Sequence, residues 1–267
     1  MLTLNLKSLQ LFADSSSHGG GGGGSSMHQQ QTPSTPSGVT VDQFRAMSDQ
    51  EQVDTVNRIL ADPNIVVPAY LDGSETSKVM YALGMNNQMT VVSEDQLNQM
   101  SGRELFRTVY DAPNGMTAGE ILDQVKSGEY TQLSGAGGSA HGRALYFATN
   151  FGESASYGVR GDNSTVMHAK LNSNAKLIDE STLRSQVRNN STYRYQLKAS
   201  NKDDLAIYAI AKGYDGWYSG SYTMMINRGV MTASSTNKRA VKKGTSKRTK
   251  DTNWSNMASS WDDAAPT

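Results

Sequence analysis

The residues from Gly142 to Tyr157 have the types and spacing best suited to chemistry in this chain. They predict a short apolar strand from Ala144 to Ala148, then a turn and the start of a helix that carries Ser154 and Tyr157. This layout puts Tyr146 on a strand and Tyr157 in the helix, a spacing that can hold a flat ring between two phenol rings. An ordinary buried strand followed by a capped helix explains the same pattern, so the flanking sequence has to decide.

Four further segments flank this one in the chain. Leu105-Phe-Arg107 is typical of a strand that ends in a cation. A helix is predicted from Thr117 to Ser127, and a glycine-rich loop follows at residues 134–143, where backbone can approach a ligand closely. Ala211-Lys-Gly-Tyr-Asp-Gly-Trp217 then predicts a turn, before a strand that begins at Tyr222.

In this order the segments resemble the ADP-ribosyltransferase superfamily, especially its poly(ADP-ribose) polymerase branch. The resemblance spans roughly residues 70–233 and depends on the order and spacing of motifs that are each short. It implies an α+β domain with the split sheet of that family around a cleft for NAD. It also implies that NAD is the substrate and that no metal takes part.

The resemblance implies roles for single residues. Arg107 would pair with the phosphates or a ribose of NAD, a task suited to its planar and always-charged fork. Tyr146 and Tyr157 would enclose the nicotinamide, and Ser154 would bond to its amide. Thr108 stands where the family usually has glycine. The implied cofactor-binding set is Arg107, Thr108, Tyr146, Phe147, Ser154 and Tyr157. A surface arginine at a strand end and a core tyrosine would fit the same positions.

The resemblance breaks at the catalytic carboxylate. Cleavage of the nicotinamide–ribose bond has an oxocarbenium-like transition state, which negative charge near the ribose stabilises. The family's glutamate would fall at Tyr222 or at its neighbours Ser221 and Thr223, and none of these is acidic. Asp215, in the turn before that strand, is the nearest carboxylate and is predicted to be catalytic together with Arg107 and Tyr146. Glu153 is the alternative carboxylate.

The composition limits the other classes of function. A chain of 267 residues has room for one domain plus tails, and its zero formal charge creates no global attraction to nucleic acid or membrane. It has no cysteine, which excludes disulfides, thiolate metal sites and a cysteine nucleophile. Of its four histidines only His141 and His168 lie outside low-complexity sequence, too few for a histidine-rich metal site. Its apolar runs are far shorter than a bilayer span, so we expect no membrane segment.

Composition also divides the chain into four stretches. Residues 1–38 are a leucine-rich peptide followed by a Gly/Ser/Gln linker, 39–100 are predicted as a helical lobe, 101–234 as the ADP-ribosyltransferase-like domain, and 235–267 as a polar tail. We expect the first and last stretches to be disordered, because they bury too little apolar area to offset the entropy of ordering. The tail has seven lysines and arginines within Lys238–Lys250, which favours a solvated tail or, as an alternative, contact with nucleic acid or an acidic protein surface.

The mixed region predicts strands interspersed with single helices, which is typical of an α+β domain with an antiparallel or mixed sheet. The predicted strands are Leu105–Val109, Ala144–Ala148, Thr165–Leu171, Leu205–Ile210 and Tyr222–Ile226. In the helical lobe, Ser48 and Glu51 predict a capping box, and Asp62-Pro63 predicts the end of that helix.

The opening residues Leu-Asn-Leu-Lys-Ser-Leu-Gln-Leu-Phe-Ala resemble the first residues of many head-associated proteins of tailed phages. This second resemblance implies a phage or prophage protein in the virion or the host cytoplasm. Together the interpretations predict a head-associated protein that binds NAD and transfers ADP-ribose to a host protein. The alternative, which the missing glutamate favours, is an inactive virion structural protein on the same fold.

Overall fold

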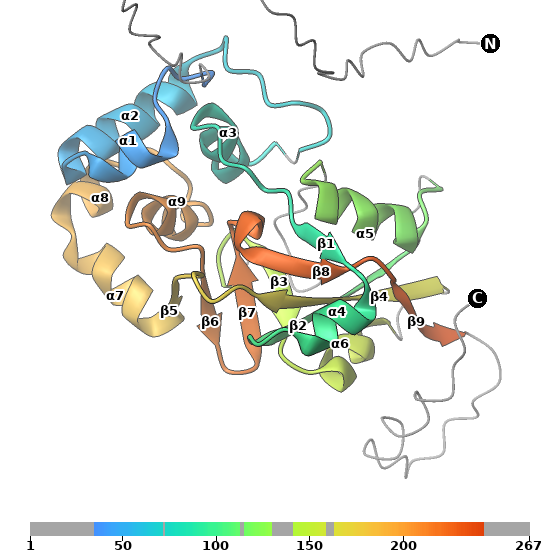
Figure 1. Cartoon of the computed structure of the whole chain (residues 1–267). Helices are drawn as coiled ribbons and strands as arrows, with labels where there is room; N and C mark the ends of the chain where they lie inside the picture. Colours follow the sequence, from blue (N-terminus) through green and yellow to red (C-terminus); the bar gives the residue numbers. More distant parts are fainter. Residues whose placement is uncertain (1–34, 72, 113–114, 130–140, 159–162, 243–267) are drawn as a thin grey trace, which may run out of the picture. The chain divides into compact units, whose positions relative to one another are not determined.

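A computed structural model describes residues 35–71, 73–112, 115–129, 141–158 and 163–242, and for 157–158, 163 and 240–242 it describes the backbone alone (Figure 1). These residues all belong to one unit of the chain. They form helices and one nine-stranded mixed sheet, which confirms the predicted α+β class. None of the helices in this part of the chain is long and apolar enough to cross a bilayer.

The sheet has the strand order β1-β8-β4-β2-β3-β7-β6-β5, and β9 pairs with β4. Its pairs are antiparallel except for β1 with β8 and β5 with β6. The strands are β1 (Thr90–Val92), β2 (Glu104–Tyr110), β3 (Leu145–Ala148), β4 (Asn163–Leu171), β5 (Leu177–Asp179), β6 (Gly216–Ser219), β7 (Tyr222–Met225), β8 (Met231–Ser234) and β9 (Lys238–Lys242). Four of the five predicted strands are thereby confirmed, as β2, β3, β4 and β7.

Several helices begin where the sequence supplies a side-chain cap. Ser48, Ser93 and Thr117 each start a helix with a capping box, in which side chain and backbone exchange hydrogen bonds across three residues. The helices are α1 (Val41–Ala46), α2 (Asp49–Ala61), α3 (Glu75–Ala82), α4 (Glu94–Gln99), α5 (Ala118–Ser127), α6 (Phe151–Gly158), α7 (Glu180–Asn189), α8 (Ser191–Gln196) and α9 (Asp204–Ala211), with a 3-10 turn at Arg228–Val230. Gly128 ends α5 at a φ of 86°, which glycine adopts without strain.

The prediction of a strand at Leu205–Ile210 is wrong, because these residues form α9. Every residue of α9 from Leu205 to Ala211 is buried. A helix buried on all sides has no polar face, so its sequence lacks the 3.6-residue alternation that separates a helix from a buried strand.

The beginning of the tail at 235–267 is not disordered. Residues 238–242 form β9, which pairs antiparallel with Asn163–Val166 of β4. The strand β4 is longer than its other partner β8, which pairs only with Ala169–Leu171. The remaining backbone groups along that edge of β4 need partners, and β9 supplies them. The rest of the predicted tail, residues 243–267, and residues 1–34 lie outside the described residues.

Side-chain alternation gives the sheet two distinct faces. Phe106 pairs with Ala148, which in turn pairs with Tyr222, so these three side chains share one face. Phe151 of α6 packs on this face, and the centre of its ring lies 5.9 Å from that of Phe106. We call this side of the sheet the α6 face. The opposite face carries Leu105, which packs with Leu122 and Val125 of α5, and we call it the α5 face. Figure 1 shows α5 and α6 on opposite sides of the sheet.

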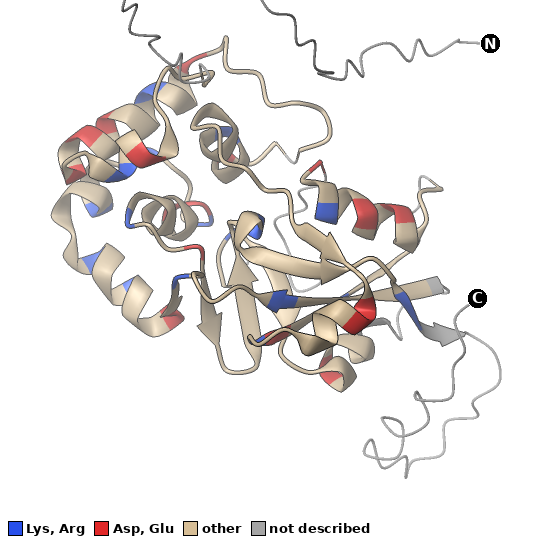
Figure 2. Ribbon diagram, in the orientation of Figure 1, with Lys and Arg blue, Asp and Glu red and all other residues tan. Residues whose placement is uncertain are grey.

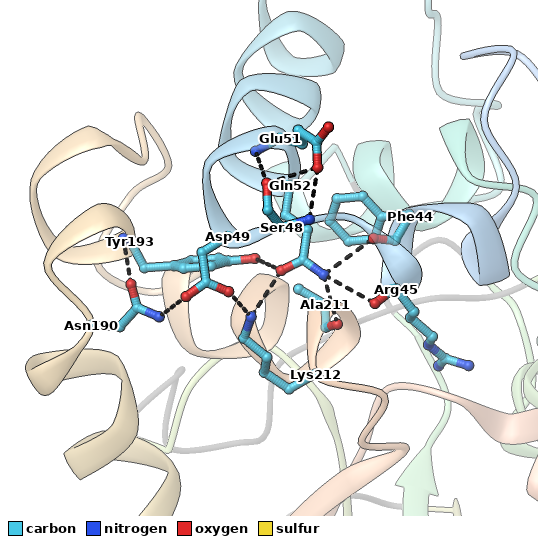
Figure 3. Close-up of polar contacts among 10 residues, drawn as sticks. All are labelled: Phe44, Arg45, Ser48, Asp49, Glu51, Gln52, Asn190, Tyr193, Ala211 and Lys212. Atoms are coloured by element: carbon cyan, nitrogen blue, oxygen red, sulfur yellow. Dashed lines mark hydrogen bonds and ion pairs between the residues drawn. The ribbon is translucent and has the colours of Figure 1, made fainter.

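A buried amide connects the predicted helical lobe to the second half of the chain (Figure 3). Gln52 of α2 is 1% exposed, and its Nε2 donates to the backbone carbonyls of Phe44 and Ala211, each at 3.1 Å. Its Oε1 accepts from the Tyr193 hydroxyl and from Nζ of Lys212, each at 2.9 Å. One side chain therefore joins α1 and α2 to α8 and the end of α9.

The apolar core also joins the predicted helical lobe to the second half of the chain. One cluster of buried side chains contains Phe44, Val53 and Val79 from the predicted lobe together with Ile207 of α9 and Trp217 of β6. The lobe also contributes β1 and α4, and β1 pairs with β8 at one edge of the sheet. Residues 39–100 and 101–234 therefore share both a core and a sheet.

We expect Gln52→Leu to lower the free energy of unfolding by about 2–4 kcal/mol, because the Tyr193 hydroxyl and Lys212 lose a buried acceptor. Urea denaturation of the full chain measures this. Gln50→Leu is the matched control, since Gln50 is an exposed glutamine on the same helix, and it should change stability by no more than about 0.5 kcal/mol. Equal losses in the two variants would contradict a central role for the Gln52 amide.

A second polar cluster fastens α4 and β9 to the α6 face. Oε1 of Glu94 lies 3.1 Å from Nδ1 of His168 and 3.0 Å from Nζ of Lys238. The His168 ring stacks on that of Phe106 at 4.8 Å. Burial alone would raise the pKa of Glu94, but the Ser234 hydroxyl, Lys238 and His168 outweigh it and lower the pKa to about 2.

This pKa shift predicts acid sensitivity. A carboxylate whose pKa is lower in the folded than in the unfolded state stabilises the fold. This contribution is complete when the pH is above the pKa of the unfolded chain, near 4.5, and it is lost as the pH falls toward about 2. Since one pKa unit corresponds to about 1.4 kcal/mol, the contribution is at most about 3.5 kcal/mol. Glu94→Gln should therefore lose less stability than the wild type between pH 4.5 and 2 in urea titrations, whereas Asp95→Asn, an exposed position on the same helix, should follow the wild type. Parallel pH curves for Glu94→Gln and the wild type would refute this.

Candidate functional site

Two hydroxyl groups meet on the α6 face where β2, β3 and α6 come together. Oγ of Ser154 on α6 lies 2.8 Å from Oγ1 of Thr108 on β2, and Ser154 is 2% exposed. Thr108 is two residues from Phe106, and Tyr146 is two residues from Ala148, the partner of Phe106, so Thr108 and Tyr146 share the α6 face. The structure thus brings together Thr108, Tyr146 and Ser154 of the predicted cofactor-binding set.

The start of α6 fixes the orientation of Ser154. The side chain of Asn150 accepts from the backbone N–H of Glu153 at 2.8 Å, and its amide donates to Oε2 of Glu153 at 3.1 Å. This reciprocal pair satisfies groups that a helix start otherwise leaves without partners. Ser154 follows directly and turns toward β2.

Two half-buried tyrosines border these hydroxyls. Tyr146 donates its hydroxyl proton to the Gly142 carbonyl at 2.9 Å and accepts from the backbone N–H of His141 at 3.1 Å. Burial raises the pKa of Tyr146, so its hydroxyl stays neutral. Tyr222 of β7 shares the same face through the β3–β7 pairing. The side chain of Tyr157, predicted as the second ring around the nicotinamide, lies outside the described residues.

Arg107 and Phe147 have their side chains on the other side of the sheet. Arg107 pairs in register with Met167, whose side chain belongs to the α5-face core, and Phe147 belongs to that core too. Nη1 of Arg107 donates to the backbone carbonyl of Tyr146 at 2.9 Å. Burial, and secondarily the charge of Arg107, lowers the pKa of Arg228 to about 10. Arg107 therefore contacts the predicted site only at the backbone carbonyl of Tyr146, and its charge lies near that of the buried Arg228.

Asp215 holds the loop before β6 in place. It is buried, its Oδ1 accepts from the side-chain amide of Asn227 at 2.7 Å, and its Oδ2 accepts from the backbone N–H of Lys176 at 2.8 Å. Its backbone carbonyl accepts from the N–H of Ile226 and of Asn227, each at 3.0 Å. These contacts give Asp215 a structural task, and its catalytic role stays a prediction.

Glu153 lies next to the position where the resemblance expects a glutamate. Its Oε1 accepts from the Ser221 hydroxyl at 2.6 Å. Strand β7 itself has no acidic residue, and Figure 2 shows the ribbons of β3, β6 and β7 in the tan of uncharged residues. The carboxylate at this end of β7 therefore comes from α6.

Sequence reasoning missed one polar group beside Tyr146. Nδ1 of His141 lies 2.7 Å from Oε2 of Glu180, and Oε1 of Glu180 accepts from Nε of Arg184 at 2.8 Å. His141 and Glu180 are far apart in sequence, so no local motif links them. A histidine three residues before the predicted strand was the one available signal.

Two hollows, of about 380 and 310 Å³, lie along α7. The first is lined by Thr182, Ser185, Gln186, Asn189, Asn190 and Tyr208, and the second by Ser181, Arg184, Val187, Arg188, Asp204 and Leu205. Neither includes Thr108, Tyr146 or Ser154. Most of the predicted glycine-rich loop falls on residues 130–140, outside the described residues. Among the described residues, no three histidine or acidic side chains are grouped to hold a metal ion.

Comparison of the chain with protein-family models, with curated proteins and with solved structures finds no match.

Proposed function

We propose that this domain binds NAD in the manner of an ADP-ribosyltransferase, with the nicotinamide on the α6 face. The observation that supports this most is the contact between Thr108 and the buried Ser154 beside Tyr146. A nicotinamide amide both donates and accepts hydrogen bonds, and two hydroxyls can serve both needs. The aromatic ring of Tyr146 offers a flat apolar surface for the pyridine ring.

In this proposal the chain is a head-associated phage protein, and the reaction transfers ADP-ribose from NAD to a host protein. The bond between the nicotinamide nitrogen and ribose C1′ breaks, and its electron pair leaves with the nicotinamide. Positive charge then develops on the ribose, and Glu153 is the carboxylate that contacts the start of β7, through the hydroxyl of Ser221. Glu153 in this role replaces the glutamate that the family carries on the strand.

The second candidate is a virion structural protein that keeps this fold without activity. The observation that favours it is the engagement of Glu153, because both of its carboxylate oxygens already accept hydrogen bonds, from Ser221 and Asn150. A carboxylate held in this way stabilises an oxocarbenium ion only if it can turn toward the ribose.

NAD binding can be measured by calorimetry on the full chain. Ser154→Ala should weaken binding about 5- to 10-fold, because one hydrogen bond to the amide, worth about 1 kcal/mol, is lost. Ser156→Ala is the matched control, since Ser156 is an exposed serine on the same helix. Absence of binding by the wild type at millimolar NAD, or equal effects of the two variants, would overturn the proposal.

Nicotinamide release from NAD tests the carboxylate. Glu153→Gln should lower the rate about 10²- to 10³-fold, as expected for one lost charge at the transition state. Tyr222→Glu should raise it, because this position shares the α6 face with Tyr146, whereas Thr223 is buried on the other face. A rate unchanged in Glu153→Gln but abolished in a stably folded Asp215→Asn would identify Asp215 instead. No cleavage by the wild type or by Tyr222→Glu would favour the structural candidate.

A further inference from the structure

His141 lies in the loop before β3, yet both its backbone and its side chain are held by hydrogen bonds. Its backbone N–H donates to the Tyr146 hydroxyl at 3.1 Å, and its carbonyl accepts from Nε1 of Trp217 at 3.0 Å. Its Nδ1 lies 2.7 Å from Glu180, yet its side chain is 38% exposed. Contacts with β3, β6 and α7 therefore fix both backbone and side chain of a group that solvent still reaches.

The partner of His141 determines which ring nitrogen is available. Burial alone would raise the pKa of Glu180, but its hydrogen bonds with Arg184 and His141 outweigh it and lower the pKa. An ionised carboxylate only accepts, so the proton of the neutral imidazole lies on Nδ1 and the lone pair on Nε2. Among the residues that the structure describes, no group bonds to Nε2.

The imidazole also lies beside the proposed site. Its ring centre is 6.2 Å from that of Tyr146 and 6.5 Å from that of Tyr222, nearly parallel to the latter at 24°. These two tyrosines border the surface where we place the nicotinamide. A fixed proton acceptor thus lies beside both tyrosines that border the proposed nicotinamide site.

We propose that His141 is the general base that deprotonates a hydroxyl acceptor in this site, with Glu180 as its positioning residue. The inference rests on the proposed NAD function and names the class of acceptor. The oxygen of a serine, threonine, tyrosine or water bonds to ribose C1′, and its proton passes to Nε2 of His141. The C1′–N bond breaks with its electron pair on nicotinamide, which leaves neutral. A carboxylate acceptor would be ionised already and would need no base.

The test uses the full chain, NAD and a serine-containing peptide, with nicotinamide release as the readout. His141→Asn keeps an N–H that can reach Glu180 and removes Nε2. It should bind NAD as the wild type does in calorimetry but release nicotinamide about 10²- to 10⁴-fold more slowly, the usual contribution of a general base. His168→Asn is the matched control, because His168 also pairs with a carboxylate, and it should keep the wild-type rate.

Two further readouts separate catalysis from a structural role. Free imidazole should restore activity to His141→Ala, which a structural role would not allow. The acidic limb of the rate–pH profile should disappear in His141→Asn. Among the described residues, Glu180 from α7, Tyr146 from β3 and Tyr222 from β7 are the titratable groups that contact His141, and Arg184 contacts Glu180. Glu180→Gln should move that limb, since it removes the charge beside the ring.

The possible failures are distinguishable. A wild type that does not bind NAD overturns the proposed function and, with it, this inference. A wild type that binds NAD, together with a His141→Asn variant that releases nicotinamide at the wild-type rate, overturns the inference alone. So does a wild type that binds NAD but transfers ADP-ribose only to carboxylate or guanidinium acceptors.

Discussion

The position of β2 between β4 and β3 is the constraint on which the site depends. β2 pairs with β4 over its whole length, from Glu104 to Tyr110, so its register is fixed and its side chains cannot change face. This alternation sends Arg107 into the core under α5 and Thr108 toward α6. The phosphate-binding role that the resemblance implies for Arg107 therefore has to act from the α5 face, while the hydroxyls and rings gather on the other.

Helix α7 holds Glu180 in position beside His141. At its first turn, Glu180 follows β5, and Asp179 at the end of β5 pairs with Tyr218 of β6. At its other end, the amide of Asn190 donates to Asp49 at 2.6 Å. Asp49 also binds Lys212, which donates to Gln52 (Figure 3). Because both ends of α7 are fastened, Glu180 has a defined place beside His141.

The sequence predicted the elements whose patterns are local. Ser48 and Thr117 carry capping boxes that the sequence displays directly, and β2, β3, β4 and β7 show as short apolar runs. The predictions from sequence were wrong where tertiary contacts determine the secondary structure. Helix α9 is buried on all sides, and β9 exists because the edge of β4 extends past β8. The resemblance put Thr108 and Ser154 in one cofactor-binding set, but their contact, like the pairing of His141 with Glu180, is known only from the tertiary structure.

In the proposed reaction, charge stabilisation and proton removal come from different sides of Tyr222. The residue before it, Ser221, bonds to Glu153 of α6, and the ring of Tyr222 itself stacks near His141. In the family that the sequence resembles, the charge that stabilises the ribose would come from a glutamate on the strand itself. In this chain the strand supplies hydroxyls, a helix supplies the negative charge, and the loop before β3 supplies the base. Such a division needs Glu153 to turn from Ser221 and Asn150 toward the ribose, so the strength of these two hydrogen bonds sets how far the site can act as an enzyme.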